Sequence, residues 1–186
     1  MKGKARFIVL LAFALVVFAS LAQSAFAGTH KTTFANGVYA ISSSGQSPII
    51  LDKSSDAKRT SGTGGSPSSS GSRTAWITTK YYALSGGLMI SYKTSIYWEW
   101  RGSTVTNKHW LTPQQTTPGP FVFYVNSTNG DSGWQTWNRK SHGQWYGSKT
   151  GHFVQQVTKL GTIKRWHPLH EYWIRGNGTY TWHAHE

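Results

Sequence analysis

Residues 88–101 read LMISYKTSIYWEWR, and the alternation of apolar and polar side chains in this stretch decides the fold. A repeat of two residues places successive side chains on opposite faces of an extended chain, as in a strand with one buried face. We therefore predict a strand over 88–101 that follows a strand over 76–84, with a turn at 85–87 between them. The side chains expected to be buried are Ile96, Trp98 and Trp100, and those expected to face outward are Tyr97, Glu99 and Arg101.

The same alternation continues after residue 73, where all ten tryptophans of the chain lie. Short apolar stretches are separated there by turn residues such as Gly, Asn and Ser. Only residues 153–160 fit a helix, and Val154 and Val157 favour a strand even there, because β-branched side chains suit strands. The predicted fold is all-β, an antiparallel β-sandwich or small barrel.

The first 27 residues have the three parts of a secretory signal peptide. Three basic residues lie among the first six, and residues 7–21 are almost entirely apolar. The sequence AFA at 25–27 places small residues at the positions that signal peptidase reads. We therefore predict cleavage after Ala27 and secretion of the remaining chain.

The composition of the predicted mature chain limits its function. Removing residues 1–27 leaves 159 residues, which suits one domain with its own core. Three of the 19 basic residues are lost, so 16 remain against 6 acidic residues and the net charge is +10. Because the chain has no cysteine, the exported domain relies on packing and hydrogen bonds rather than disulfides, which favours a bacterial exported protein.

The predicted mature chain divides into three segments. Residues 28–51 form a short N-terminal β element with an Asn36-Gly37 turn, which either adds a strand to the main domain or forms an arm. Residues 52–73 are rich in Ser and Gly and nearly free of apolar side chains, which is typical of a flexible linker or loop. Residues 74–186 form the tryptophan-rich antiparallel β domain.

A terminal hairpin is predicted around Asn177-Gly178, a favoured pair for a two-residue turn. Such a turn fixes every later pair of the hairpin, so the two faces of the ribbon follow from the sequence. Trp173, Trp182, Glu171 and Arg175 are expected on one face, and His170, His183 and His185 are expected around Tyr172 on the other.

The three histidines of that second face, His170, His183 and His185, are candidate metal ligands. Imidazoles two residues apart on one strand and opposite each other on two strands can converge on one ion. No carboxylate or cysteine accompanies them on the predicted face, so we favour exposed polar positions and expect no metal or other cofactor.

An enzymatic interpretation is a small secreted nuclease-like toxin. Glu171 would serve as general base and His170 or His167 as general acid, with neighbouring basic residues around a phosphate. A glycosidase needs two carboxyl groups, and only Glu99 and Glu171 lie on predicted strands. Because the chain also lacks a cysteine nucleophile and a G-x-S-x-G motif, we expect a protein that is not an enzyme.

High positive charge, many tryptophans and export together predict binding to an anionic component of the bacterial envelope: an anionic lipid, a wall polymer or a lipid-linked wall precursor. Single-stranded nucleic acid would suit the same composition, and a secreted adhesive or inhibitory domain that binds another protein is a third interpretation.

About half of the tryptophans are expected to be at least partly buried. The residues predicted to make contact are Lys164, Arg165, Trp166, Arg175, Trp134, Trp137 and Trp145.

Three aromatic stretches carry a family resemblance. They are TAWITTKYYALSGGLMISYKTSIYWEW at 74–100, GWQTWNRKSHGQWYG at 133–147 and GHFVQQVTKLGTIKRWHPLHEYW at 151–173. In these stretches the chain resembles secreted bacteriocin-like proteins of the propionicin type and the lactococcin 972 type, although it lacks the C-terminal cysteines of the propionicin type. The resemblance implies an exported antibacterial β-sandwich without an enzymatic site, acting on the envelope of competing bacteria.

Overall fold

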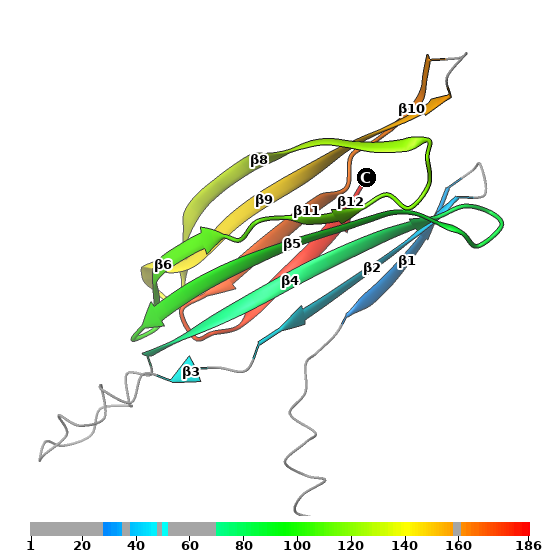
Figure 1. The fold of residues 1–186 in the computed structure, drawn as a ribbon. Helices are drawn as coiled ribbons and strands as arrows, with labels where there is room; N and C mark the ends of the chain where they lie inside the picture. The colour runs from blue at the N-terminus through cyan, green and yellow to red at the C-terminus, as the bar shows by residue number, and fades with distance from the viewer. Residues whose placement is uncertain (1–27, 35–37, 48–49, 52–69, 158–160) are drawn as a thin grey trace, which may run out of the picture.

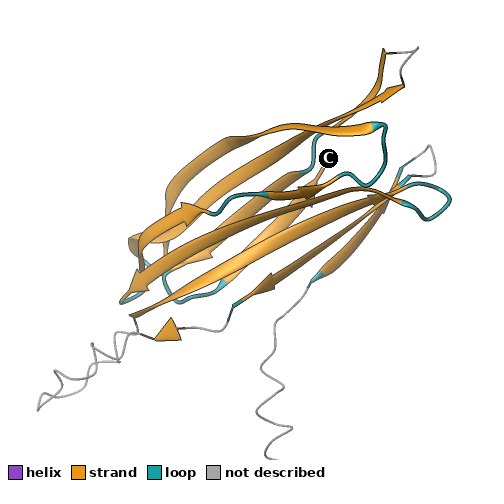
Figure 2. Ribbon diagram, viewed as in Figure 1, coloured by secondary structure: helices purple, strands orange, loops and turns teal. Residues whose placement is uncertain are grey.

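The computed structural model contains strands and no helix in its described part (Figure 2). The strands form two antiparallel sheets that pack face to face, so the predicted β-sandwich is confirmed (Figure 1). Within this part of the chain, no helix is long and apolar enough to cross a membrane. The predicted signal segment and the Asn36-Gly37 turn lie outside the described residues. The structure describes residues 28–34, 38–47, 50–51, 70–157 and 161–186.

The first sheet, called the N-terminal sheet, contains seven strands in the order β1-β2-β4-β5-β6, with β3 beside β4 and β7 beside β5. A tight loop joins β4 to β5, as predicted, and the Ala83 N–H donates to the Gly87 carbonyl at 2.9 Å to close it. The strands are β1 (Thr29–Thr33), β2 (Tyr39–Gln46), β3 (Ile50–Leu51), β4 (Ser70–Tyr82), β5 (Leu88–Arg101), β6 (Thr104–Trp110) and β7 (Gln114–Thr116).

The second sheet, called the C-terminal sheet, contains five strands built around β9. β8 pairs with one edge of β9 along most of its length, and β10 and β11 share the other edge. β12 pairs with β11 and forms the far edge of the sheet. The strands are β8 (Val122–Trp137), β9 (Lys140–Val157), β10 (Gly161–Trp166), β11 (Leu169–Arg175) and β12 (Tyr180–His185).

The N-terminal element joins the main sheet and does not form an arm. β2 pairs with β4 from Tyr39 opposite Tyr82 to Gln46 opposite Ala75. β4 begins at Ser70, so residues 70–73 belong to the sheet, and the predicted linker boundary at residue 73 is wrong. Polar side chains predict a loop at 70–73, but strand pairing with β5 supplies partners for the backbone there. Residues 52–69 lie outside the described part of the chain.

β8 and β9 form a long ribbon that contains residues 126–133, although Gly, Asn and Ser in this stretch are typical of a turn. The pairing shifts between Asn129 and Ser132, and such a bulge accommodates the extra residues within a strand. The chain reverses later, at Asn138 and Arg139, which have φ values of 49° and 61°. Positive φ at both central residues is the requirement of a type I′ two-residue hairpin turn.

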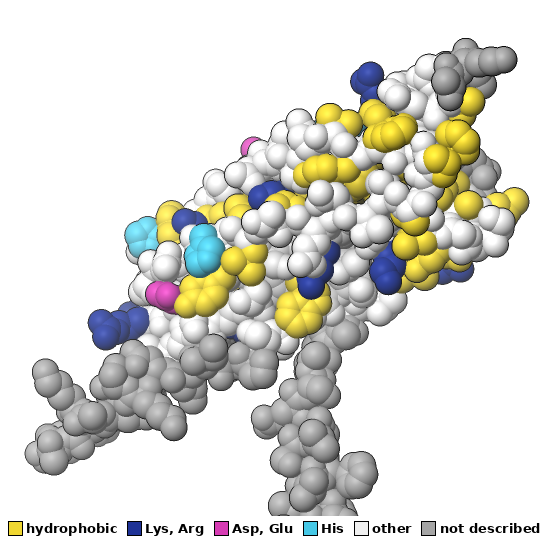
Figure 3. Space-filling model, viewed as in Figure 1, with side chains coloured by type: hydrophobic (Ala, Val, Ile, Leu, Met, Phe, Trp, Pro, Cys, Tyr) yellow, Lys and Arg dark blue, Asp and Glu magenta, His cyan; other side chains and the backbone are white. Residues whose placement is uncertain are grey.

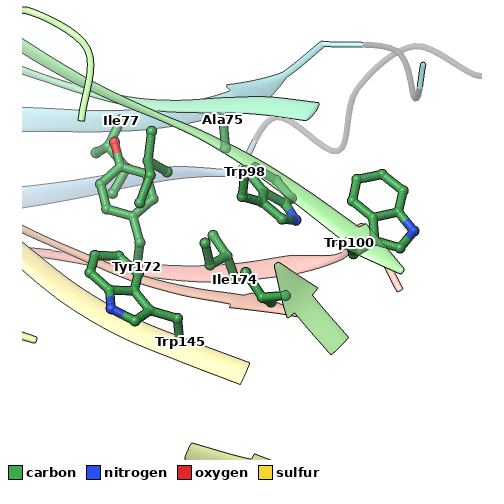
Figure 4. Packing of buried hydrophobic residues seen from close by; sticks show 9 residues of the cluster. Ala75, Ile77, Trp98, Trp100, Trp145, Tyr172 and Ile174 are labelled. Atoms are coloured by element: carbon green, nitrogen blue, oxygen red, sulfur yellow. The ribbon is translucent and has the colours of Figure 1, made fainter. Parts of the chain in front are cut away.

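The core lies between the sheets and is built mainly from aromatic and β-branched side chains. Ile96, Trp98 and Trp100 of β5 are at most 2% exposed, which confirms the face predicted for this strand. Figure 4 shows Trp98 of the N-terminal sheet close to Ile174 of the C-terminal sheet, and both belong to one buried cluster. A second cluster contains Tyr81, Tyr92, Phe153 and Trp166, so apolar packing extends along the whole sandwich.

The tryptophans are more buried than the sequence suggested. Four of the ten are buried, five are half-buried, and only Trp134 is exposed, at 42%. A small domain without disulfides needs large apolar side chains in its core, and each aromatic side chain can bury about 150–250 Å² of surface. The exposed indole surface available for binding is therefore small, and Trp134 is the most accessible of the ten indoles.

Candidate functional site

The register of the terminal hairpin differs from the predicted register by one residue. The loop between β11 and β12 has three residues, 176–178, because the Arg175 N–H donates to the Thr179 carbonyl at 2.9 Å. Gly178 has a φ of 78°, the left-handed conformation that the third position of such a loop favours. The predicted two-residue turn at Asn177-Gly178 is therefore wrong.

The shift of one residue moves every β12 side chain to the opposite face, because strand side chains alternate. His183 lies opposite Glu171, and the expected set of three histidines on one face is not formed. His170 points into the core, while the other two histidines point outward. The outward residues are Glu171, Trp173, Arg175, His183 and His185, and the inward ones are His170, Tyr172, Ile174, Tyr180 and Trp182.

His170 joins the two sheets through a buried hydrogen-bond network. Its Nε2 lies 2.9 Å from Thr79 Oγ1, and its Nδ1 lies 2.8 Å from Thr94 Oγ1. Thr94 Oγ1 also lies 2.8 Å from the hydroxyl of Tyr172, which donates to the Thr94 carbonyl. A neutral imidazole has one donor and one acceptor nitrogen, so it satisfies this network without a charge. Burial lowers the pKa of His170 to about 3.

Glu171 lies on the outward face of β11, where Tyr146, His183 and His185 surround it. The Tyr146 hydroxyl donates to Oε1 at 2.6 Å, and His185 Nε2 donates to Oε2 at 2.9 Å. His183 Nδ1 lies 3.9 Å from Oε2. The hydrogen bond to the carboxylate raises the pKa of Tyr146. Trp173 packs between the Tyr146 and His183 rings, with centroid distances of 4.9 and 5.0 Å, and supports the cluster from one side.

The predicted acid–base pairs of a nuclease are not assembled. Glu171 and His170 lie on opposite faces of β11, so their side chains cannot act on one substrate. His167 instead contacts His152, with 2.9 Å between the two Nδ1 atoms, and the described residues show no hydrogen bond from His167 to Glu171. Burial and the neighbouring His167 lower the pKa of His152.

The basic stretch at 164–166 is less available than its sequence suggests. Trp166 is fully buried, because alternation on β10 turns its ring into the core against Tyr81. It therefore offers no surface to a ligand, and its predicted role as a contact residue is wrong. Lys164 Nζ lies 3.6 Å from the Trp166 ring centroid, so this cation is held against the core. Only Arg165, which points outward, remains exposed in this stretch.

Arg175 and Trp137 come together at the hairpin end of the C-terminal sheet. The guanidinium carbon lies 5.9 Å from the Trp137 ring centroid. Arg175 Nε donates to Gln144 Oε1 at 2.9 Å, and a second guanidinium nitrogen donates to Thr181 Oγ1 at 3.2 Å. Burial lowers the pKa of Arg175. These bonds fix the side chain in place and leave part of the guanidinium exposed.

Trp134 and Trp145 are direct partners across the β8–β9 ribbon, and a lysine lies over both of their rings. Lys108 Nζ of β6 is 4.9 Å from the Trp134 ring centroid and 5.4 Å from that of Trp145. A cleft of about 220 Å³ opens here between β6 and the ribbon, and we call it the Lys108 cleft. Its polar and aromatic lining residues are Lys108, His109, Trp110, Asn129, Ser132 and Trp145.

A second cation lies behind the wall of the Lys108 cleft. Lys149 points inward from β9 and is only 9% exposed. Its Nζ lies 5.2 Å from the ring centroid of Trp110, which packs edge-on against Trp145 at 6.0 Å. Burial lowers the pKa of Lys149. The Lys108 cleft is thus lined by one lysine and two indole rings, and a second lysine lies behind the Trp110 ring.

Across the described residues, cations lie over aromatic rings rather than beside carboxylates. Six of the twelve described Lys and Arg residues make such contacts, and the ion pairs found there join Glu171 only to histidines. Figure 3 shows basic and hydrophobic side chains side by side on the visible face, with few acidic ones. The Glu186 carboxylate acts electrostatically on Lys164, but none of these cations forms an ion pair with a described carboxylate. The six cations are Lys31, Lys93, Lys108, Lys149, Lys164 and Arg175.

The sequence-based interpretation missed Lys108, Trp110 and Lys149. Lys108 and Trp110 alternate within the stretch TNKHW, and this pattern places both on one face of β6. The alternation of Lys108 and Trp110 can be seen in the sequence, but no sequence pattern near them indicates that β6 lies beside the β8–β9 ribbon. Lys149 follows a run of small and polar residues, and no local pattern marks it as buried.

Any inference about the function of this chain rests on its geometry and charge. Comparison of the chain with protein-family models, curated protein sequences and solved structures found no match.

Proposed function

We propose that this chain is an exported, non-enzymatic protein that binds a phosphate-bearing component of the bacterial envelope through the Lys108 cleft. The observation that carries the proposal is Lys108 Nζ over the rings of Trp134 and Trp145, at a cleft where no described carboxylate pairs with it. An ammonium group attracts phosphate, while an indole ring suits a boundary that is half apolar and half wet.

The surroundings of the Lys108 cleft support an anionic partner. Arg139 and Lys140 are exposed at the tip of the same β8–β9 ribbon. Asn129 and Ser132 add polar groups to the opposite wall of the cleft. Anionic lipids, wall polymers and lipid-linked wall precursors all carry phosphate next to a less polar group, and this combination matches the chemistry of the cleft.

We further propose that binding to the envelope makes the protein antibacterial. The resemblance to bacteriocin-like proteins and the predicted signal segment support it, since an exported envelope binder meets the envelopes of neighbouring cells. Inhibition of at least one strain in a broad bacterial panel is the expected result. The absence of inhibition across the panel would contradict the antibacterial action but not the binding to the envelope.

Binding to vesicles tests the proposed partner class. The protein is expected to bind phosphatidylglycerol vesicles at least tenfold more tightly than phosphatidylcholine vesicles at low salt. Raising the salt to about 1 M shortens the screening length to roughly 3 Å, so most of this binding should disappear. Co-sedimentation measures both effects. Equal binding to the two lipids, or binding that is insensitive to salt, would contradict an electrostatic partner.

Purified bacterial walls separate the two sources of phosphate. Walls should bind the protein before, and not after, their phosphate polymers are extracted if the partner is a wall polymer. If the partner is a lipid headgroup, the vesicles bind and the walls do not. Failure of both vesicles and walls would overturn the proposed function.

A further inference from the structure

We propose that Glu171, His183 and His185 form a binding site for a divalent transition-metal ion such as Zn²⁺. The site lies on the outward face of the terminal hairpin. It is made by strands β11 and β12, whereas the Lys108 cleft is made by β6, β8 and β9, so the two proposals are independent.

The ligand atoms already lie close to one another. One ligand atom from each of the three residues falls within 4.8 Å of the other two. A tetrahedral ion with bonds of about 2.0–2.1 Å to nitrogen and oxygen holds its ligand atoms about 3.3 Å apart. The distances from Glu171 Oε2 to His185 Nε2 and to His183 Nδ1 are 2.9 and 3.9 Å, one just below this value and one just above it.

The backbone places the three residues without strain. Glu171 and His183 are direct partners in the β11–β12 pairing, and His185 follows two residues later on the same face of β12. The histidine side chains are 63% and 52% exposed, so they have room to rotate and bring their ligand atoms closer to an ion. The rigid part of the site is Glu171, whose side chain is 17% exposed.

Glu171 is oriented by a partner that leaves one oxygen free for a metal. The Tyr146 hydroxyl holds Oε1 at 2.6 Å, so Oε2 faces the two histidines. Such an outer partner fixes a ligating carboxylate and typically changes metal affinity by 10–100-fold. Trp173 covers one side of the cluster, and the exposed histidines leave the other side open to water.

The ligand set selects the class of metal. Two imidazoles and one carboxylate suit Zn²⁺, Cu²⁺ or Ni²⁺, while Ca²⁺ and Mg²⁺ prefer oxygen ligands alone. Three protein ligands also leave a fourth position of a tetrahedral ion to water or to a ligand from outside. The chain offers a matched comparison, because His152 and His167 form a second histidine pair without a described carboxylate partner.

Titration of the purified protein with Zn²⁺ in a buffer that does not bind metals tests the site. Calorimetry should show one ion per chain. Glu171→Gln and His183→Ala should each weaken binding at least tenfold, and Tyr146→Phe should weaken it less than either. His152→Ala, the matched control, should bind as the unaltered protein does. Circular dichroism in the presence of a chelator verifies that each variant is folded.

Three results would overturn the proposal. The first is the absence of Zn²⁺ binding by the unaltered protein. The second is unchanged binding in folded Glu171→Gln and His183→Ala. The third is a loss in His152→Ala as large as that in His183→Ala, which would place the ion at the other histidine pair.

Discussion

Replacing Trp98 with alanine is expected to lower the free energy of unfolding by about 3–5 kcal/mol. Trp98 is fully buried at the centre of the sandwich, where its ring contacts Trp100 and Tyr180 at centroid distances of 6.3 and 6.2 Å. Its indole N–H also donates to the Arg175 carbonyl at 3.3 Å. The substitution removes these contacts and leaves a large cavity between the two sheets.

Urea unfolding followed by far-ultraviolet circular dichroism measures the loss. Trp134→Ala is the matched control, because this indole is 42% exposed and its removal leaves no closed cavity. A loss below about 1 kcal/mol is expected for the control. Similar losses in the two variants would contradict the assignment of Trp98 to the core and Trp134 to the surface.

Acidification is expected to destabilise the protein through His170. Burial lowers the pKa of His170 to about 3 in the folded protein, whereas an unfolded histidine titrates near its ordinary value of 6.5. Between these values only the unfolded chain takes up the proton. The stability present above pH 6.5 is therefore lost as the pH falls toward 3, by up to about 1.4 kcal/mol per pH unit and on the order of 5 kcal/mol in total.

The slope of unfolding free energy against pH measures this effect. His170→Gln keeps polar groups facing Thr79 and Thr94 but cannot titrate, so its slope between pH 6.5 and 4 should be shallower than that of the unaltered protein. His142→Gln, which alters an exposed histidine, should leave the slope unchanged. If His170→Gln does not fold, the His170 ring signals in nuclear magnetic resonance should still show no titration above about pH 4. Titration near pH 6.5 would contradict a neutral, buried imidazole.

The sequence was sufficient for the features that depend on local alternation. The repeat of two in β5 identified Ile96, Trp98 and Trp100 as buried, and this was confirmed. It also indicated two faces for the terminal hairpin. A one-residue difference in the hairpin loop then reversed the faces of β12, because the prediction placed the turn at Asn177-Gly178 alone and the loop also includes Gly176.

The candidate sites could be predicted only in part, since they depend on which strands become neighbours. Glu171 and the two terminal histidines were each singled out, but the reversed register separated the carboxylate from its histidines. Trp134 and Trp145 were also singled out, while the lysine above them comes from β6, 26 and 37 residues earlier in the chain. No local pattern encodes that contact.

Vesicle binding by two lysine variants tests whether the Lys108 cleft binds a phosphate-bearing envelope component. Lys108→Gln and Lys80→Gln remove the same charge, but Lys80 is exposed on the outer face of the N-terminal sheet, away from the cleft. A basic residue near an anionic surface contributes about 1 kcal/mol, or roughly fivefold in affinity. Lys108→Gln should therefore weaken binding to phosphatidylglycerol vesicles about fivefold or more, and Lys80→Gln less than about twofold. Equal losses in the two variants would contradict the cleft as the binding site.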